Sequence, residues 1–157
     1  MNGNDTARSG NPHSTAKIAD HPIHPMLIPF PIVCFILTFI LDIVYSRGDG
    51  GVAEASTWIL GFGLVMAAFA AVTGLTDYLG DERVRRLSDA LKHMLANVTA
   101  VVLELVNFVL RLKDPESIGS VGVYISAVVV LILLYSGWKG GDLVFKHGVG
   151  VRDRSNL

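Results

Sequence analysis

Charged residues are scarce in this chain of 157 residues. Only 17% of the residues are Asp, Glu, Lys or Arg, whereas 51% are hydrophobic. A mean hydropathy of +0.49 is too high for an ordinary soluble domain, and the low charge also excludes an intrinsically disordered chain. The 13 Lys and Arg are balanced by 14 Asp and Glu and form no basic stripe, so the sequence offers no electrostatic footprint for nucleic acid.

Cysteine is almost absent as well. The single Cys34 excludes a disulfide scaffold, and its place within an apolar block is typical of a small packing residue. The sequence also lacks a phosphate-binding glycine loop followed by Lys and Ser or Thr, a dinucleotide-binding Gly-x-Gly-x-x-Gly, and a Cys/His iron–sulfur pattern. With no catalytic motif, a role as an enzyme ranks below the other functional hypotheses.

The hydrophobic residues are concentrated in four blocks, each near the ~20 residues that a membrane-spanning helix requires. The blocks are Met26–Tyr45, Trp58–Tyr78, Leu91–Leu112 and Val121–Trp138. The connections between them are short and rich in Gly, Pro or charge, so consecutive helices are expected to be antiparallel neighbours. The sequence therefore predicts an all-α integral membrane four-helix bundle in contact with the lipid bilayer.

The organisation along the chain follows from this count. Residues 1–20 are polar and lack apolar periodicity, which predicts a disordered tail, and residues 152–157 form a second short tail. Between them lies a membrane domain at 21–151. The first apolar block is too long for a secretory signal and is followed by no cleavage site, so we expect an uncleaved span. No internal repeat is apparent.

Basic residues are distributed unevenly between the two sides of the predicted bundle. Ten Lys or Arg lie in the two tails and the second connection or beside them, whereas only Arg47, Arg111 and Lys113 lie on the other side. The positive-inside rule therefore places both termini in the cytoplasm.

The third span carries a polar stripe. At 100° per residue, His93, Asn97, Glu104, Asn107 and Arg111 project within about 40° of one direction. A charged side chain that faces lipid costs ~2.5–3.5 kcal/mol on insertion scales, so the stripe is expected to face the bundle interior or a water-filled cavity. Glu104 lies roughly 16 Å along the helix from His93, which is too far for the two to share a small metal site.

The histidines are predicted to lie on the cytoplasmic side. His21 and His24 open the first span, His93 opens the third, His147 follows the fourth, and Asp77 closes the second at the same level. The second span also has a stripe of small residues that permits close approach of another backbone or of a flat cofactor. This stripe consists of Gly63, Ala67, Ala70, Gly74 and Asp77.

Three motifs resemble a family of small bacterial membrane proteins, the domain of unknown function numbered 2231. They are His21-Pro-Ile-His24-Pro-Met-Leu-Ile-Pro-Phe-Pro31, the pair His93 and Asn97, and Gly140-Gly-Asp-Leu-Val-Phe-Lys-His147-Gly-Val-Gly-Val151. The resemblance covers about residues 21 to 151. It implies a four-helix domain in the bacterial inner membrane, with relatives in which such a domain is joined to a Rieske-type iron–sulfur domain, and hence a link to electron transfer.

Two hypotheses assign a cofactor to the histidines. A b-type haem would be bound by His93, with His24 or His147 as the second axial ligand and Asn97 beside it. Alternatively, a divalent metal ion would be bound by His21, His24, His93 and His147 with Asp77, because three or four nitrogen or oxygen ligands suffice for zinc.

Two further hypotheses need no cofactor. Protons or a small solute could pass along the third span from His93 and Asn97 to Glu104, Asn107 and Arg111, as in pumps and transporters. The same polar groups could instead link the helices of a non-catalytic accessory subunit. Across all four hypotheses, the expected partners are a second copy of this chain or a redox protein.

Overall fold

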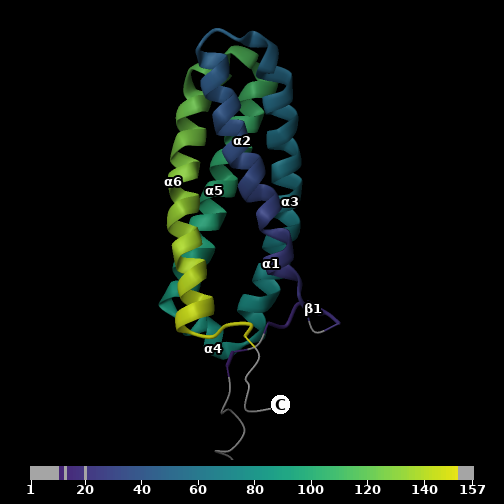
Figure 1. The fold of residues 1–157 in the computed structure, drawn as a ribbon, viewed down its shortest axis with the longest axis vertical. Coiled ribbons are helices and arrows are strands. Elements are labelled where there is room, and N and C mark those ends of the chain that lie inside the picture. Colours follow the sequence, from purple (N-terminus) through teal and green to yellow (C-terminus); the bar gives the residue numbers. More distant parts are fainter. Residues whose placement is uncertain (1–10, 13, 20, 152–157) are drawn as a thin grey trace, which may run out of the picture.

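Four long helices run up and down along the bundle axis in the computed structural model, which describes residues 11–12, 14–19 and 21–151 (Figure 1). The first is α2 (Pro29–Ser46), preceded by the short α1 (Ile23–Leu27). It is followed by α3 (Ala53–Gly80), α5 (Ser88–Lys113) and α6 (Val121–Gly141). Each is long and apolar enough to cross a membrane, so the predicted all-α four-span bundle is confirmed.

An aspartate caps the N-terminus of the short helical segment in each of the three connections. The 3₁₀ turn η1 (Gly50–Val52), the short helix α4 (Glu82–Arg85) and the 3₁₀ turn η2 (Pro115–Gly119) each follow an aspartate that accepts a backbone N–H two residues ahead. These aspartates are Asp49, Asp81 and Asp114. The charged second connection therefore forms a separate helix, α4, before α5 begins.

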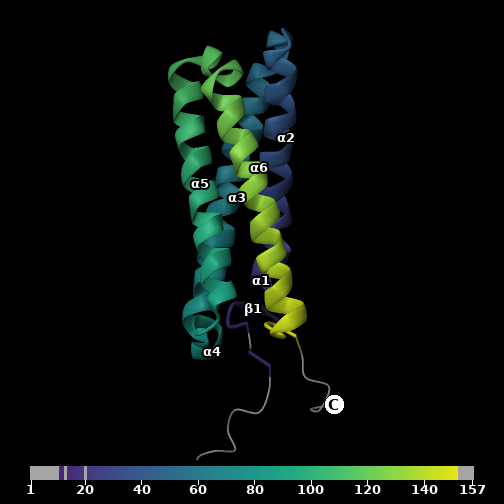
Figure 2. The same ribbon diagram turned by 90° about the vertical axis from the view of Figure 1, so that its left-hand side faces the viewer.

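The two ends of the bundle differ. β1 (Lys17–Ile18), α4 and the π-helical turn η3 (Asp142–Lys146) that extends α6 lie at one end, whereas η1 and η2 lie at the other (Figures 1 and 2). The described parts of the segments that the charge count assigned to one side are thus together.

Part of the predicted N-terminal tail is structured. β1 pairs antiparallel with β2 (His21–Pro22), and Asp77 at the end of α3 accepts hydrogen bonds from the backbone N–H groups of Thr15 and Ala16, both at 2.7 Å. Residues 14–16 of the segment predicted to be a polar tail thus lie against the end of α3, where the Asp77 carboxylate accepts these hydrogen bonds. Residues 1–10, 13, 20 and 152–157 lie outside the described residues.

The bundle is apolar outside and partly polar inside. Phe69 and Leu134 are more than half exposed on the outer surface, as are many other large apolar side chains, which suits a surface in contact with lipid. Inside, a layer of Phe35, Leu60, Ala67, Ala100 and Val129 packs in the middle of the bundle.

The two helical hairpins bury corresponding positions. In α2 the buried residues are Pro31, Phe35, Thr38 and Asp42, and adding 69 to each number gives four of the buried residues of α5, Ala100, Glu104, Asn107 and Arg111. In α3 and α6 the offset is 66, which relates Ser56, Leu60, Gly63 and Ala70 to Gly122, Ser126, Val129 and Ser136.

The pattern of buried positions therefore repeats from one hairpin to the other. The side chains at corresponding positions differ too much for the repeat to be apparent in the sequence. Because both hairpins start from the same end, the pseudo-two-fold axis that relates them runs along the bundle.

Candidate functional site

The rings of His24 on α1 and His93 on α5 lie close together, edge to face, between the two hairpins. Their ring centroids are 6.5 Å apart and the ring planes are nearly perpendicular, at 87°. We call these two residues the histidine pair. The 69-residue offset that relates α2 to α5 also relates His24 to His93, so the pair lies at equivalent positions of the two halves.

Hydrogen bonds fix the tautomer of both rings. Nδ1 of His24 lies 2.9 Å from the backbone oxygen of Ala70, and Nδ1 of His93 lies 2.9 Å from that of Ser136. A carbonyl oxygen only accepts, so Nδ1 carries the hydrogen in each ring and Nε2 of a neutral ring keeps a lone pair. The same arrangement orients histidines that bind metals through Nε2.

The two Nε2 atoms differ in their surroundings. Nε2 of His93 accepts a hydrogen bond from the Asn97 side chain at 3.1 Å, so His93 is neutral. The same Asn97 nitrogen also donates to the backbone oxygen of His93 at 3.0 Å, so it keeps a partner if it leaves Nε2. Among the described residues, none hydrogen-bonds Nε2 of His24.

Glycines let both rings lie against a neighbouring helix. A Cβ atom on Gly74 would lie 2.8 Å from Cε1 of His24, and a Cβ atom on Gly140 would lie 3.1 Å from Cε1 of His93. Each glycine follows the carbonyl-bearing residue of its helix by four positions, so one turn of α3 and one turn of α6 hold the two histidines in the same way. The small stripe predicted on the second span thus packs partly against His24.

The remaining proposed metal ligands lie elsewhere. His21 contacts the backbone oxygen of Ala19, His147 lies 3.0 Å from the carboxylate of Asp89, and Asp77 binds the N-terminal segment. Within the described ranges, no three His, Cys, Asp or Glu side chains are placed to hold one metal ion. The five-residue metal site is therefore not assembled, and His147 pairs with Asp89 rather than with His93.

Further contacts close the same end of the bundle. Gly150 donates its N–H to the backbone oxygen of Pro12 at 2.9 Å, and Arg83 of α4 donates to the oxygen of Asn11 at 3.3 Å. Asp81 beside Arg83 raises the pKa of that guanidinium through a hydrogen bond. The two segments that flank the helices are thus joined at this end of the bundle.

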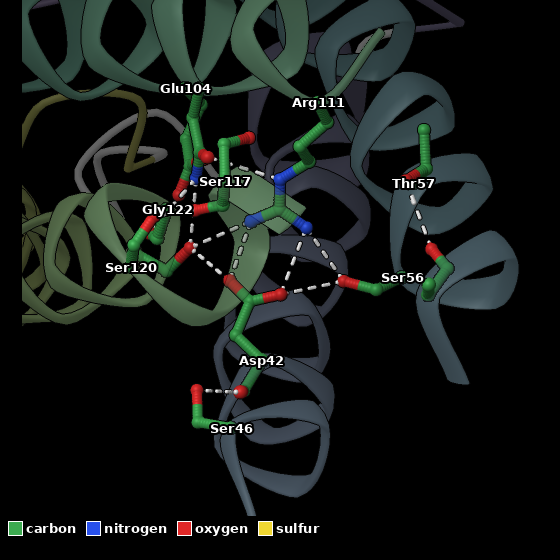
Figure 3. A network of polar contacts seen from close by, with 12 residues as sticks. Asp42, Ser46, Ser56, Thr57, Glu104, Arg111, Ser117, Ser120 and Gly122 are labelled. Atoms are coloured by element: carbon green, nitrogen blue, oxygen red, sulfur yellow. Dashed lines mark hydrogen bonds and ion pairs between the residues drawn. The ribbon is translucent and has the colours of Figure 1, made fainter. Parts of the chain in front are cut away.

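A second polar site lies toward the opposite end. Arg111 of α5 and Asp42 of α2 form an ion pair in which both side chains are fully buried (Figure 3). The guanidinium nitrogens Nη1 and Nη2 donate to Oδ1 and Oδ2 of Asp42 at 2.9 and 2.5 Å. We call this pair and the side chains bonded around it the core network. Its members are Asp42, Ser56, Glu104, Asn107, Arg111 and Ser126.

All five N–H groups of Arg111 are used. Besides the two bonds to Asp42, Nη1 donates to Ser56 at 2.7 Å, Nη2 to Ser126 at 3.3 Å, and Nε to Asn107 at 3.0 Å. The hydroxyls of Ser56 and Ser126 in turn donate to the two oxygens of Asp42, each at 2.7 Å. The ion pair is therefore enclosed by hydrogen bonds from all four long helices.

The polar stripe of the third span was correctly predicted to face inward, but it forms two groups instead of one path. His93 and Asn97 belong to the histidine end, Glu104, Asn107 and Arg111 belong to the core network, and Ala100 lies between them in the apolar layer. Sequence reasoning missed Asp42. It is the one acidic residue in the first apolar block, and the predicted topology puts it at the same level as Arg111, so charge complementarity between spans could have identified it.

The family comparison agrees with this architecture. The family described as "Predicted membrane protein (DUF2231)" matches residues 20–153, which is most of the chain. The protein is thus a member of a family of predicted membrane proteins, and the chain belongs to the DUF2231 family. No curated protein and no solved structure matches it.

Proposed function

We propose that this protein binds a b-type haem between His24 and His93 and acts in electron transfer at the membrane. The spacing of the histidine pair is the observation that carries the proposal. Two iron–nitrogen bonds of about 2 Å each, together with the distance from each nitrogen to its ring centre, would separate axial imidazoles by roughly 6 Å between centroids. The observed separation is 6.5 Å.

The chemistry of the donors supports the same proposal. Both rings have Nδ1 bonded to a backbone carbonyl, which leaves Nε2 as the ligating atom. The backbone carbonyls and the two glycines hold the rings in equivalent places of the two halves, so a planar ligand on the pseudo-two-fold axis would meet the same donor on each face. A bound haem would supply one-electron redox chemistry, and the backbone carbonyls of Ala70 and Ser136 would orient the two histidines that hold it.

The location proposed is a bacterial inner membrane with both termini in the cytoplasm, on the basis of the basic residues at the histidine end. A redox protein would then approach the bundle from the cytoplasmic side.

Spectroscopy of the full chain tests the haem proposal. The protein is purified in detergent from haem-replete cells, and spectra are recorded oxidised and after dithionite reduction, with elemental analysis of the same sample. We expect a Soret band and sharp reduced α and β bands, lost in His24→Ala and in His93→Ala but kept in the matched control His147→Ala. Asn97→Ala should also retain haem, because Asn97 is not a ligand.

Circular dichroism and size-exclusion chromatography establish that each variant is folded. A folded, colourless wild-type protein from haem-replete cells contradicts the proposal. One equivalent of a metal without a Soret band, lost in His93→Ala, contradicts it equally and assigns the pair to a metal ion. If histidine substitutions only destabilise the bundle, an accessory structural role replaces the redox role.

A further inference from the structure

The carboxyl group of Glu104 is buried in the middle of the membrane bundle and only half of it is hydrogen-bonded. The side chain has no solvent exposure, and Oε2 accepts one bond from the amide of Asn107 at 3.0 Å. Oε1 has no partner in the part of the chain that the structure describes. A carboxylate normally accepts several hydrogen bonds, so this environment suits an ionised group poorly.

The charges of the core network do not balance if Glu104 is ionised. The charged groups of the network are Asp42 from α2 and Arg111 from α5, and α3 and α6 contribute only the hydroxyls of Ser56 and Ser126. Arg111 is neutralised by Asp42 and has no N–H left to donate. An ionised Glu104 would therefore add an uncompensated negative charge to the bundle interior, which is costly within a bilayer.

The pseudo-two-fold repeat indicates that a carboxyl group is not needed here for packing. The position that corresponds to Glu104 in the first half is Phe35, which is almost fully buried in the apolar layer. Thr38, the counterpart of Asn107, has a hydroxyl oxygen that also lacks a partner within the described residues. At this level one half of the bundle packs the apolar ring of Phe35, whereas the other half carries the titratable carboxyl group of Glu104.

We propose that Glu104 is a proton-binding site, at which the carboxyl group holds a resident proton at neutral pH. The ligand is the proton itself, bound to one oxygen of Glu104, while the other oxygen accepts from Asn107. The Asp42–Arg111 pair remains ionised beside it, so the core network carries no net charge. The proposal is independent of whether the histidine pair binds haem.

Infrared difference spectroscopy tests this directly. The full chain is reconstituted in nanodiscs at neutral pH with glutamate carboxyls isotope-labelled, and the Glu104→Gln spectrum is subtracted from that of the wild type. We expect the difference to contain the carbonyl stretch of a protonated carboxylic acid and no carboxylate stretch. Glu116→Gln is the matched control, because Glu116 is exposed on η2 and should lose only carboxylate stretches.

The alternatives give different spectra. Loss of a carboxylate pair of bands in Glu104→Gln overturns the proposal. The same result with bands that shift when Na⁺ is replaced by a large organic cation also overturns it and identifies a bound cation. Glutamine keeps the shape of the side chain and its acceptor for Asn107, and unfolding curves of the two variants establish that the spectra come from folded protein.

Discussion

Removing one partner of the Asp42–Arg111 pair should destabilise the bundle strongly. Both side chains are fully buried, and Asp42→Asn would leave a guanidinium that cannot lose its proton among neutral groups. Breaking a buried pair by removing one partner costs about 3–5 kcal/mol. We therefore expect Asp42→Asn to lower the free energy of unfolding by about that amount.

Arg111→Met should cost less than Asp42→Asn. Asp42 would keep the two hydroxyl donors of Ser56 and Ser126, each worth ~1 kcal/mol, and it can take up a proton in place of its lost partner. The double variant Asp42→Leu/Arg111→Met removes both charges together. Replacing a buried ion pair by apolar residues is often neutral or stabilising, so its free energy of unfolding should return close to that of the wild type.

Unfolding of the detergent-solubilised protein, followed by circular dichroism as a function of denaturing detergent, measures these differences. Glu54→Gln, at an exposed position in the first turn of α3, is the control for loss of a carboxylate and should change stability by less than 0.5 kcal/mol, which is about the limit for surface substitutions. Single variants that cost less than about 1 kcal/mol, or a double variant as damaging as the sum of the singles, would refute the electrostatic reasoning.

Three more perturbations separate the sites. Gly140→Ala should weaken or abolish haem binding, because the added Cβ would meet the His93 ring. The control Gly137→Ala, on the same helix, adds a Cβ with nothing within 4 Å and should leave the reduced spectrum unchanged. Equal spectra for the two variants would contradict the argument that Gly140 makes room for the ring. Ser126→Ala removes a hydroxyl that bridges Asp42 and Arg111 and should lower the free energy of unfolding by about 1–3 kcal/mol, measured as above. Asp77→Asn weakens the acceptor of the N-terminal segment, so hydrogen exchange at the amides of Thr15 and Ala16 should accelerate while exchange in α6 does not; unchanged exchange would show that the segment is held by its other contacts.

The span count and the inward direction of the third span followed from the sequence, because lipid allows few structures and makes charge expensive. Four apolar blocks of suitable length leave little choice but a helix bundle, and the stripe from His93 to Arg111 can avoid lipid only by turning inward. Both arguments compare one helix with the lipid around it, so they hold whichever helices are neighbours.

What the sequence left open depended on which helices are neighbours. The sequence left open whether His24 or His147 lies beside His93. The packing of α1 against α3 and of α5 against α6 brings His24 to it, while His147 after η3 lies at Asp89. The partner of Arg111 was missed for the same reason. Asp42 stands on a different span, and a pattern search within one helix does not reveal a contact between two.

The pseudo-two-fold repeat explains how these two sites differ. At the histidine end each half contributes an imidazole, a backbone carbonyl and a glycine, and the haem proposal rests on this correspondence. At the core network the corresponding positions carry opposite chemistry, Asp42 against Arg111 and Phe35 against Glu104. Opposite charges at equivalent positions neutralise each other across the axis, so only Glu104 is left without a counter-charge. The two halves thus correspond where a shared ligand is proposed and differ where buried charges must be balanced. The carboxyl group of Glu104, which has no counter-charge, is the observation that supports a bound proton there.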